Sequence, residues 1–203
     1  MVKEIIFLAI LISWSFATPN DTLIVRLKDI DPTILQDVRY VTPNNFTGKI
    51  LYKNKEIYLR YAVACSLKKV NDYLKEEYGY RLVVFDGYRP LSVQKIMWEI
   101  FPNSDYVANP AKGSKHNRGA SVDVSIVDKN GQPLDMGTEY DAFRKEAKAY
   151  YKNLPKNALK NRKILQEAMT KFGFKVMTSE WWHFDYKDWE RFNIIDYIPN
   201  ENW

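Results

Sequence analysis

The chain mixes two hydrophobic periodicities without alternating them strictly, and this mixture limits the folds open to it. Apolar residues recur at helical spacing in residues 59–78, 90–100, 140–154 and 158–172. Between them lie short runs rich in β-branched and aromatic residues, "RLVVFD", "SVDVSIVD", "KVMTS" and "WWHFDY". Strict alternation of strands and helices would indicate a parallel sheet, so the pattern favours an α+β domain.

Composition and charge set the number of domains and narrow the partners. With 203 residues, 46% of them hydrophobic and 15% aromatic, the chain can build one sizeable core, and we expect a single domain over residues 18–203. The formal charge of +5 is spread over short mixed runs such as "LKKVNDYLKEEYGYR". A solvated surface of mixed charge explains this better than a nucleic-acid interface, so no nucleic-acid partner is predicted. The sequence does not fix an oligomeric state.

Residues 1–17, "MVKEIIFLAILISWSFA", differ from the rest of the chain. A lysine near the start, an apolar run and the small-x-small pair Ser15 and Ala17 are typical of a cleaved secretory signal. A buried N-terminal strand is the alternative, because Glu4 weakens the charge pattern of a signal. The apolar run is too short to span a bilayer, so we expect an exported, periplasmic or secreted protein without stable membrane association.

The stretch "GSKHNRGASVDVSIVD" contains the first chemical pattern. A two-residue period from Ser121 to Val127 places Asp123 on a polar face, with apolar residues on the other face. His116 precedes this strand, and Gly119 permits a tight turn that would bring His116 and Asp123 together. Such a pair alone is more often a hydrogen-bonded structural feature than a metal site.

His183, the second of the chain's 2 histidines, changes that balance. Together with His116 and Asp123 it makes a set of two imidazoles and one carboxylate, which matches a catalytic zinc site with a fourth position open to water. Bound water ionises there near neutral pH and can attack an amide carbon. Glu180 is the natural base, since two adjacent tryptophans can exclude bulk water and raise its pKa.

The segment "EWWHFD" also has a plainer interpretation, as an aromatic core strand with incidental polar ends. In an ideal strand Glu180 and His183 point to opposite faces. The catalytic interpretation therefore requires a bulge or bend at the strand entrance.

A possible catalytic cation lies in "LVVFDGYRPLSVQ". Gly87 permits a tight turn, and Pro90 biases Arg89 toward extended geometry at a helix entrance. A guanidinium fixed there can stabilise the oxyanion of a tetrahedral intermediate. The alternative is a surface arginine paired with Asp86.

Together, "DGYRP", "SKHNRGASVD" and "EWWHFDY" resemble the zinc D-alanyl-D-alanine dipeptidases of the VanX type. These belong to the D-Ala-D-Ala metallopeptidase family, which shares its fold with the hedgehog signalling domain. The resemblance extends to "DVRYVTPNNFTG", "MGTEYD" and "NRKIL" and covers the chain from about Asp29 onward. It implies a small, mostly antiparallel sheet with flanking helices.

The family pattern implies one Zn²⁺ per chain, bound by His116, Asp123 and His183. It makes Glu180 the general base and then the general acid, and Arg89 the oxyanion partner. The chain departs from the family pattern in two places: a serine stands at position 121, where the family usually has alanine, and the stretch from Phe101 to Gly113 is shorter than in some members.

The same resemblance implies contacts to a small dipeptide substrate. Ser114 matches a position that binds the dipeptide carboxylate, Asp141 the group that holds the free ammonium, and Tyr40 a wall of the small pocket. The implied reaction is hydrolysis of D-Ala-D-Ala to two D-Ala. The alternatives are a D,D- or L,D-carboxypeptidase or endopeptidase acting on peptidoglycan stem peptides, and a binding module with structural zinc, against which Glu180 argues.

Overall fold

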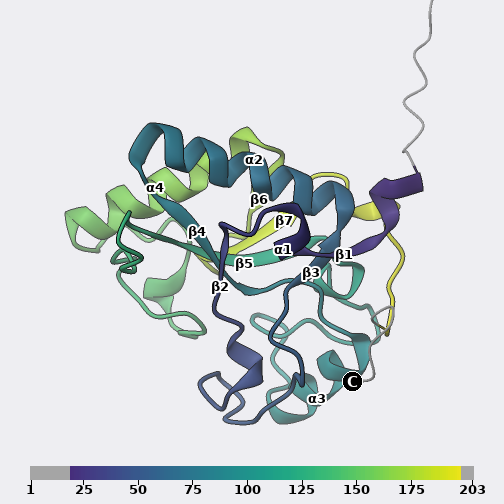
Figure 1. The fold of residues 1–203 in the computed structure, drawn as a ribbon. Coiled ribbons are helices and arrows are strands. Elements are labelled where there is room, and N and C mark those ends of the chain that lie inside the picture. The colour runs from purple at the N-terminus through teal and green to yellow at the C-terminus, as the bar shows by residue number, and fades with distance from the viewer. Residues whose placement is uncertain (1–18, 198–203) are drawn as a thin grey trace, which may run out of the picture.

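The chain, described here by a computed structural model over residues 19–197, folds around a five-stranded sheet (Figure 1). The strands run in the order β2-β4-β5-β7-β6, and only β2 and β4 are parallel neighbours. The expected α+β fold with a mostly antiparallel sheet is therefore confirmed. The expected signal peptide lies outside the described residues. The strands are β2 (Leu35–Gln36), β4 (Arg81–Asp86), β5 (Ser121–Val127), β6 (Phe174–Val176) and β7 (His183–Tyr186).

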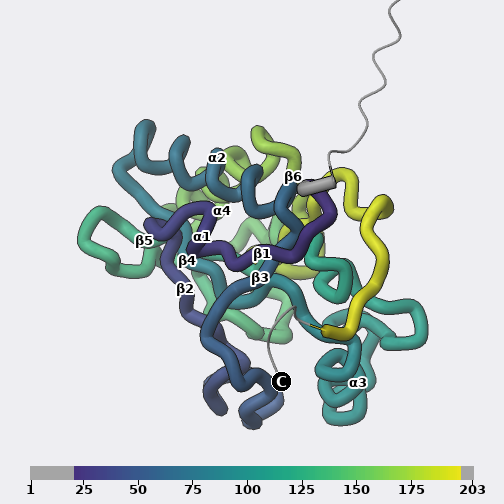
Figure 2. Tube along the Cα trace, turned by 45° about the vertical axis from the view of Figure 1, so that its right-hand side comes forward, coloured from purple at the N-terminus to yellow at the C-terminus, as the bar shows by residue number. Residues whose placement is uncertain are grey.

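Helices cover the sheet unevenly. α2 and α4 lie together over one face, while α3 lies on the far side from them, among long loops (Figures 1 and 2). A second, two-stranded sheet pairs β1 (Ile24–Arg26) with β3 (Tyr58–Arg60). The α-helices are α1 (Leu27–Ile30), α2 (Tyr61–Tyr78), α3 (Leu91–Ile100) and α4 (Lys156–Lys171). The 3₁₀ turns are η1 (Pro19–Thr22), η2 (Arg39–Val41), η3 (His116–Arg118), η4 (Lys145–Ala147) and η5 (Trp189–Arg191).

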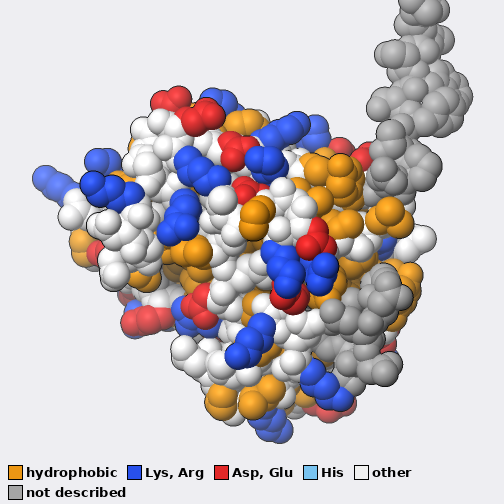
Figure 3. All heavy atoms as spheres, in the orientation of Figure 1, with side chains coloured by type: hydrophobic (Ala, Val, Ile, Leu, Met, Phe, Trp, Pro, Cys, Tyr) orange, Lys and Arg blue, Asp and Glu red, His pale blue; other side chains and the backbone are white. Residues whose placement is uncertain are grey.

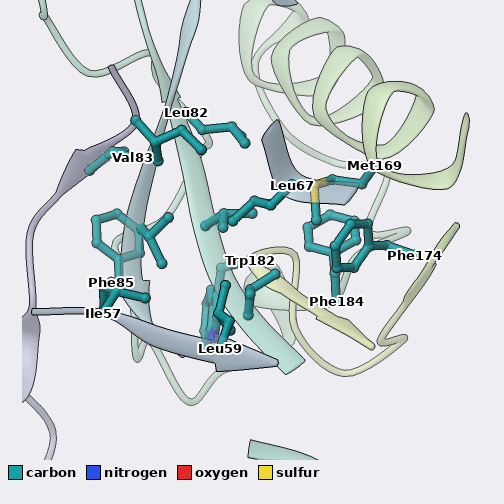
Figure 4. Close-up of a cluster of buried hydrophobic side chains, with 14 of the residues drawn as sticks. Ile57, Leu59, Leu67, Leu82, Val83, Phe85, Met169, Phe174, Trp182 and Phe184 are labelled. Atoms are coloured by element: carbon teal, nitrogen blue, oxygen red, sulfur yellow. The ribbon is translucent and has the colours of Figure 1, made fainter. Parts of the chain in front are cut away.

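The core lies between the two long helices and the sheet. Residues of α2 that recur every three or four positions are buried: Val63, Ala64, Leu67, Val70, Asn71 and Leu74. Figure 4 shows Leu67 of α2 and Met169 of α4 beside side chains of the sheet, with Met169 next to Phe174 and Phe184. Burial of each such side chain stabilises the fold by about 1.5–3 kcal/mol. This layer holds β4, β5 and β7, the strands that carry the site, in fixed positions.

The prediction of a helix over residues 140–154 is wrong. The segment contains a single 3₁₀ turn, Lys145–Ala147, and Asp141 has a φ of 58°. A left-handed residue ends any right-handed helix that reaches it. The backbone bonds elsewhere instead, since the Trp181 N–H donates to Ala147 O and the Ala149 N–H donates to Thr178 O. The segment thus runs beside the entrance to β7.

One further expectation needs correction. β7 begins at His183 instead of Trp181, so the two tryptophans belong to the loop before the strand. β5 shows the expected alternation of polar and apolar residues, and both of its faces are covered along the whole strand.

The surface carries mixed charge. On the face shown in Figure 3, basic and acidic side chains lie interspersed without a dense block of either sign. Among the described residues, no helix is both long enough and apolar enough to cross a membrane.

Candidate active site

Three neighbouring strands bring acidic and imidazole side chains into one row. Asp86 of β4 lies opposite Asp123 of β5, and Asp123 lies opposite His183 of β7. The β4–β5 register shifts between Val84 and Asp86, an irregularity of the kind that re-aims side chains next to binding sites. The polar row therefore follows directly from the sheet register.

His116 joins this row from the 3₁₀ turn before β5. Gly119 ends that turn with a φ of 67°, and a Cβ there would lie 2.8 Å from Ile24 Cδ1. Only glycine combines this conformation with so close a contact. The turn brings one ligand atom each of His116, Asp123 and His183 within 4.8 Å of one another, with all three residues buried. The three residues that the sequence singled out as ligands are thus adjacent.

Hydrogen bonds on the outer side of each imidazole fix which nitrogen faces the centre. His116 Nδ1 donates to Gly87 O over 2.7 Å, so Nε2 points inward. His183 Nε2 donates to Asp185 Oδ1 over 2.9 Å, so Nδ1 points inward. The two inward nitrogens are 3.2 Å apart. Both rings therefore present a lone pair to the same point, as metal ligands must.

Asp123 has one carboxylate oxygen ready for a cation. Asp123 Oδ1 is buried without a hydrogen-bond partner among the described residues, and it lies 3.1 Å from His183 Nδ1. An unpaired buried carboxylate oxygen is costly unless a cation occupies the space beside it. Although burial opposes protonation, the nearby carboxylates of Asp123 and Asp185 raise the pKa of His183 to about 10. The centre attracts positive charge, and its donor set fits Zn²⁺.

Glu180 lies next to this centre. Its Oε2 is 3.8 Å from His183 Nδ1, and burial raises the pKa of the carboxyl to about 7. Because β7 begins only at His183, Glu180 belongs to the preceding loop, and strand alternation does not turn it away. That resolves the difficulty seen in the sequence. The flanking residues Trp181 and Trp182 are both buried, and Trp182 lines the same cavity.

Arg89 is not a surface arginine. It is 8% exposed, and Nε and Nη2 donate to Asp86 Oδ2 over 3.0 and 2.7 Å. Nη1 donates to Gln94 Oε1 over 2.9 Å. Three of the five guanidinium N–H groups are thus engaged, which leaves two for a ligand in the cavity that Arg89 lines. The pairing with Asp86 that the sequence offered as an alternative coexists with a place in the site.

A cavity of about 850 Å³ contains these groups together with the three proposed substrate contacts, Tyr40, Ser114 and Asp141. Ser114 Oγ accepts the His116 N–H over 3.2 Å, so its own proton is available to a ligand. Burial, reinforced by the charge of Asp123, raises the pKa of Asp141 to about 8. An enclosed carboxylate of this kind gains strongly from a cationic partner.

Three polar residues of the site were missed in the sequence. Gln94 holds Arg89, Tyr140 Oη lies 3.0 Å from Asp123 Oδ2, and Asp185 accepts from Ser121 Oγ over 2.7 Å as well as from His183. Asp185 carried a usable signal, because it follows His183 by two residues and so shares its strand face. Tyr140 carried none, since the segment around it read as helix.

Comparison with known proteins identifies the family of the chain. A family model described as "D-ala-D-ala dipeptidase" matches residues 20–199. The D-alanyl-D-alanine dipeptidase of Escherichia coli K12 is 34% identical over 82% of this chain and 86% of its own, and that of Enterococcus faecium is 29% identical over 80% and 90%. A solved vancomycin-resistance D,D-dipeptidase, VanXYg in complex with a D-Ala-D-Ala phosphinate analog, is 17% identical with a TM-score of 0.41, covering 81% of this chain and 66% of that one. The chain belongs to the D-Ala-D-Ala dipeptidase family of zinc metallopeptidases.

Proposed function

We propose that the protein hydrolyses D-Ala-D-Ala to two D-Ala, with Zn²⁺ held by His116, Asp123 and His183. The observation that carries the proposal is the position of Glu180, whose carboxylate lies 3.8 Å from an inward imidazole nitrogen and lines the same cavity. A structural zinc site has no use for an ionisable group beside its open position. The family relatives named for the same reaction support this assignment.

Proton transfer is the task of Glu180. Bound Zn²⁺ supplies a Lewis acid and lowers the pKa of water toward neutrality. Glu180 takes a proton from the attacking water and passes it to the leaving amine, and its pKa of about 7 suits both directions near neutral pH. The two remaining N–H groups of Arg89 stabilise the negative charge that develops on the carbonyl oxygen, an effect worth about 3 kcal/mol for a preorganised donor.

Substrate orientation is the task of two polar side chains of the cavity. Asp141 binds the free ammonium of the dipeptide, and the Ser114 hydroxyl donates to its carboxylate. Tyr40 is buried, and its Oη lies 3.3 Å from Asp141 Oδ2. Its ring forms a wall of the pocket between these two substrate contacts and the metal centre. A carboxylate that holds the ammonium one residue from the scissile bond restricts the enzyme to dipeptides. We propose export as well, because residues 1–17 have the pattern of a secretory signal.

Cavity size favours a second candidate. A volume of about 850 Å³ is in the upper range of cavities that enclose drug-sized ligands, so there is room for more than a dipeptide. That room suits a D,D- or L,D-carboxypeptidase or an endopeptidase acting on stem peptides. Release of D-Ala from a pentapeptide, but not from free D-Ala-D-Ala, would favour it over the dipeptidase.

Metal content and D-Ala release test the proposal together. We expect about one zinc per chain and stereospecific release of D-Ala from D-Ala-D-Ala but not of L-Ala from L-Ala-L-Ala. His116→Ala and Asp123→Ala should lose both metal and activity. Asp105→Ala is the matched control, because Asp105 also lines the cavity but lies outside the three-residue cluster. Full zinc occupancy in His116→Ala would refute the ligand assignment.

A further inference from the structure

Four side chains form a continuous line of oxygen atoms across the site. Tyr140 Oη lies 3.0 Å from Asp123 Oδ2 and 3.1 Å from Tyr40 Oη. Tyr40 Oη lies in turn 3.3 Å from Asp141 Oδ2. One end of the line is the proposed zinc ligand and the other is the proposed anchor of the substrate ammonium. Two tyrosine hydroxyls therefore connect the metal centre to the substrate site.

Each of the two hydroxyls has one proton to donate, which decides its acceptor. A phenol has an ordinary pKa of about 10, so both tyrosines keep that proton at neutral pH. The Asp123 carboxylate is a stronger acceptor than a neutral phenol, so Tyr140 donates to Asp123. By the same rule Tyr40 donates its single proton to the Asp141 carboxylate, over 3.3 Å. The two hydroxyl oxygens, 3.1 Å apart, therefore lie in contact between the two carboxylates.

The two oxygens of Asp123 are consequently unequal. Oδ2 accepts from Tyr140, whereas Oδ1 has no hydrogen-bond partner among the described residues and lies 3.1 Å from His183 Nδ1 and 3.5 Å from His116 Nε2. A carboxylate that binds zinc through one oxygen leaves the fourth position open to water. A carboxylate that binds through both oxygens crowds that position.

We propose that Tyr140 is a positioning residue, whose hydroxyl presents Asp123 to the metal through Oδ1 alone and, through Tyr40, aligns Asp141 with the same centre. The inference rests on the proposed function and extends it by assigning roles to the two hydroxyls. The backbone is consistent with such a role, because Asp141 directly follows Tyr140 and is the one non-glycine residue with a positive φ among residues 19–197. Strained backbone of this kind collects at ligand sites.

A packing role for the Tyr140 ring is the competing explanation. The ring contacts Trp182 edge-on, with centroids 5.4 Å apart, and Phe85 at 4.8 Å. Tyr140→Phe keeps both ring contacts and removes only the hydroxyl. The substitution therefore separates the two explanations.

The contact between Tyr140 and Asp123 is tested by metal binding, without measuring hydrolysis. Zinc affinity is measured by competition with a chromophoric chelator, and the visible absorption of the cobalt-substituted protein reports the coordination number. We expect Tyr140→Phe to weaken zinc binding by about tenfold or more. It should also weaken the cobalt absorption, because Asp123 is then free to bind through both oxygens. Tyr58→Phe, a buried tyrosine outside the cavity, should match the parent protein in both measurements.

The substrate side is tested with Tyr40→Phe, which breaks the line beyond Tyr140. We expect zinc affinity within about twofold of the parent, and a smaller preference for free D-Ala-D-Ala over its N-acetyl derivative. In the double variant Tyr40→Phe/Tyr140→Phe, the preference for the free dipeptide over its N-acetyl derivative should fall by less than the product of the two single-variant reductions. The two effects are not independent, because both hydroxyls belong to one line.

Unchanged zinc affinity and cobalt absorption in a folded Tyr140→Phe protein would overturn the proposal. If Tyr140→Phe does not fold, a Tyr40→Phe protein that keeps the full preference of the parent for the free amine overturns it instead. A parent protein that binds zinc but leaves D-Ala-D-Ala intact contradicts the proposed function alone, since the metal measurements still test Tyr140.

Discussion

Asp185 accepts a hydrogen bond from Nε2 of His183 over 2.9 Å, and this single contact determines which nitrogen of the ring faces the metal centre. Asp185 is held in turn by Ser121 Oγ and by the ammonium of Lys115. The hydrogen bond from His183 and these two donors outweigh burial and hold the pKa of Asp185 well below its ordinary range. The outer carboxylate is therefore charged when the site is in use.

From this contact we predict that Asp185→Asn weakens zinc binding by roughly 10- to 100-fold, the usual cost of removing an outer partner of a metal ligand. Ser121→Ala should have a smaller effect, because His183 and Lys115 still hold the carboxylate. Chelator competition measures both. Equal zinc affinity in Asp185→Asn and the parent would mean that the ring is oriented by its packing.

Glu180→Gln should retain zinc and lose about 10²-fold or more in turnover, since proton transfer is removed while the ligands stay intact. Glu139→Gln is the control, because that side chain is 84% exposed and lies outside the cavity. Metal content and kcat are measured on the same samples. Turnover close to that of the parent would show that another group deprotonates the water.

N-acetylation of D-Ala-D-Ala should sharply reduce hydrolysis, because it removes the charge that Asp141 is proposed to bind and leaves a partly buried carboxylate without a partner. The expected loss in kcat/KM corresponds to several kcal/mol for a desolvated pair. Asp141→Asn should reduce the ratio of kcat/KM for the free dipeptide to kcat/KM for the acetylated dipeptide. This ratio should change by a larger factor than the zinc affinity does. If the free and the acetylated dipeptide are hydrolysed at equal rates, the dipeptidase assignment is wrong and the carboxypeptidase assignment takes its place.

Stability at low pH should depend on Asp31, which is far from the site. Burial opposes its ionisation, but hydrogen bonds from Thr33 and Asn71 outweigh burial and lower its pKa. A folded-state pKa below the unfolded value contributes stability that is complete above about pH 4 and is lost as the pH falls through the folded-state pKa.

Asp31→Asn should therefore destabilise the protein at pH 7 by roughly 1–3 kcal/mol, the range for hydrogen bonds to a charged group, and by less near pH 3. Asp29→Asn is the control, since Asp29 forms an exposed pair with Arg26. Urea unfolding at the two pH values measures the difference. A pH-independent effect would mean that the charge of Asp31 does not matter.

Processing after Ala17 should yield a mature protein that begins at Thr18. Intact-mass measurement of the protein expressed with its full sequence in a bacterial host reads the cleavage site directly. Ala17→Arg should block cleavage, because the site requires a small residue at that position. A mature chain that still begins at Met1 would favour the alternative of an N-terminal strand.

The sequence predicted which residues lie together at the site better than the path of the chain around it. Periodicity identified β4, β5 and α2 because their burial patterns are regular. It failed over residues 140–154, where the apolar spacing is helical but Asp141 adopts a left-handed conformation and the backbone bonds to the segment before β7. Long-range bonds of this kind have no local signal.

Glu180 illustrates the same limit on a smaller scale. Two-residue alternation placed it on the opposite face from His183, whereas the strand in fact starts at His183. Strand ends depend on which neighbour offers a partner, and here Trp182 O accepts the Val124 N–H while the Trp181 N–H donates to Ala147 O. The role proposed for Tyr140 could be inferred only from the structure, because it depends on the distance to Asp123.

The direct pairing of Asp123 with His183 in the β5–β7 register has a kinetic consequence. Residues 128–182 separate these strands, so β7 can dock only after a long loop has closed, and contacts of such high sequence separation form slowly. A slip of one residue would turn His183 to the opposite face of the sheet. The newly made chain therefore has no assembled metal centre until its last strand has found the correct register, and hydrolysis cannot begin before folding is complete.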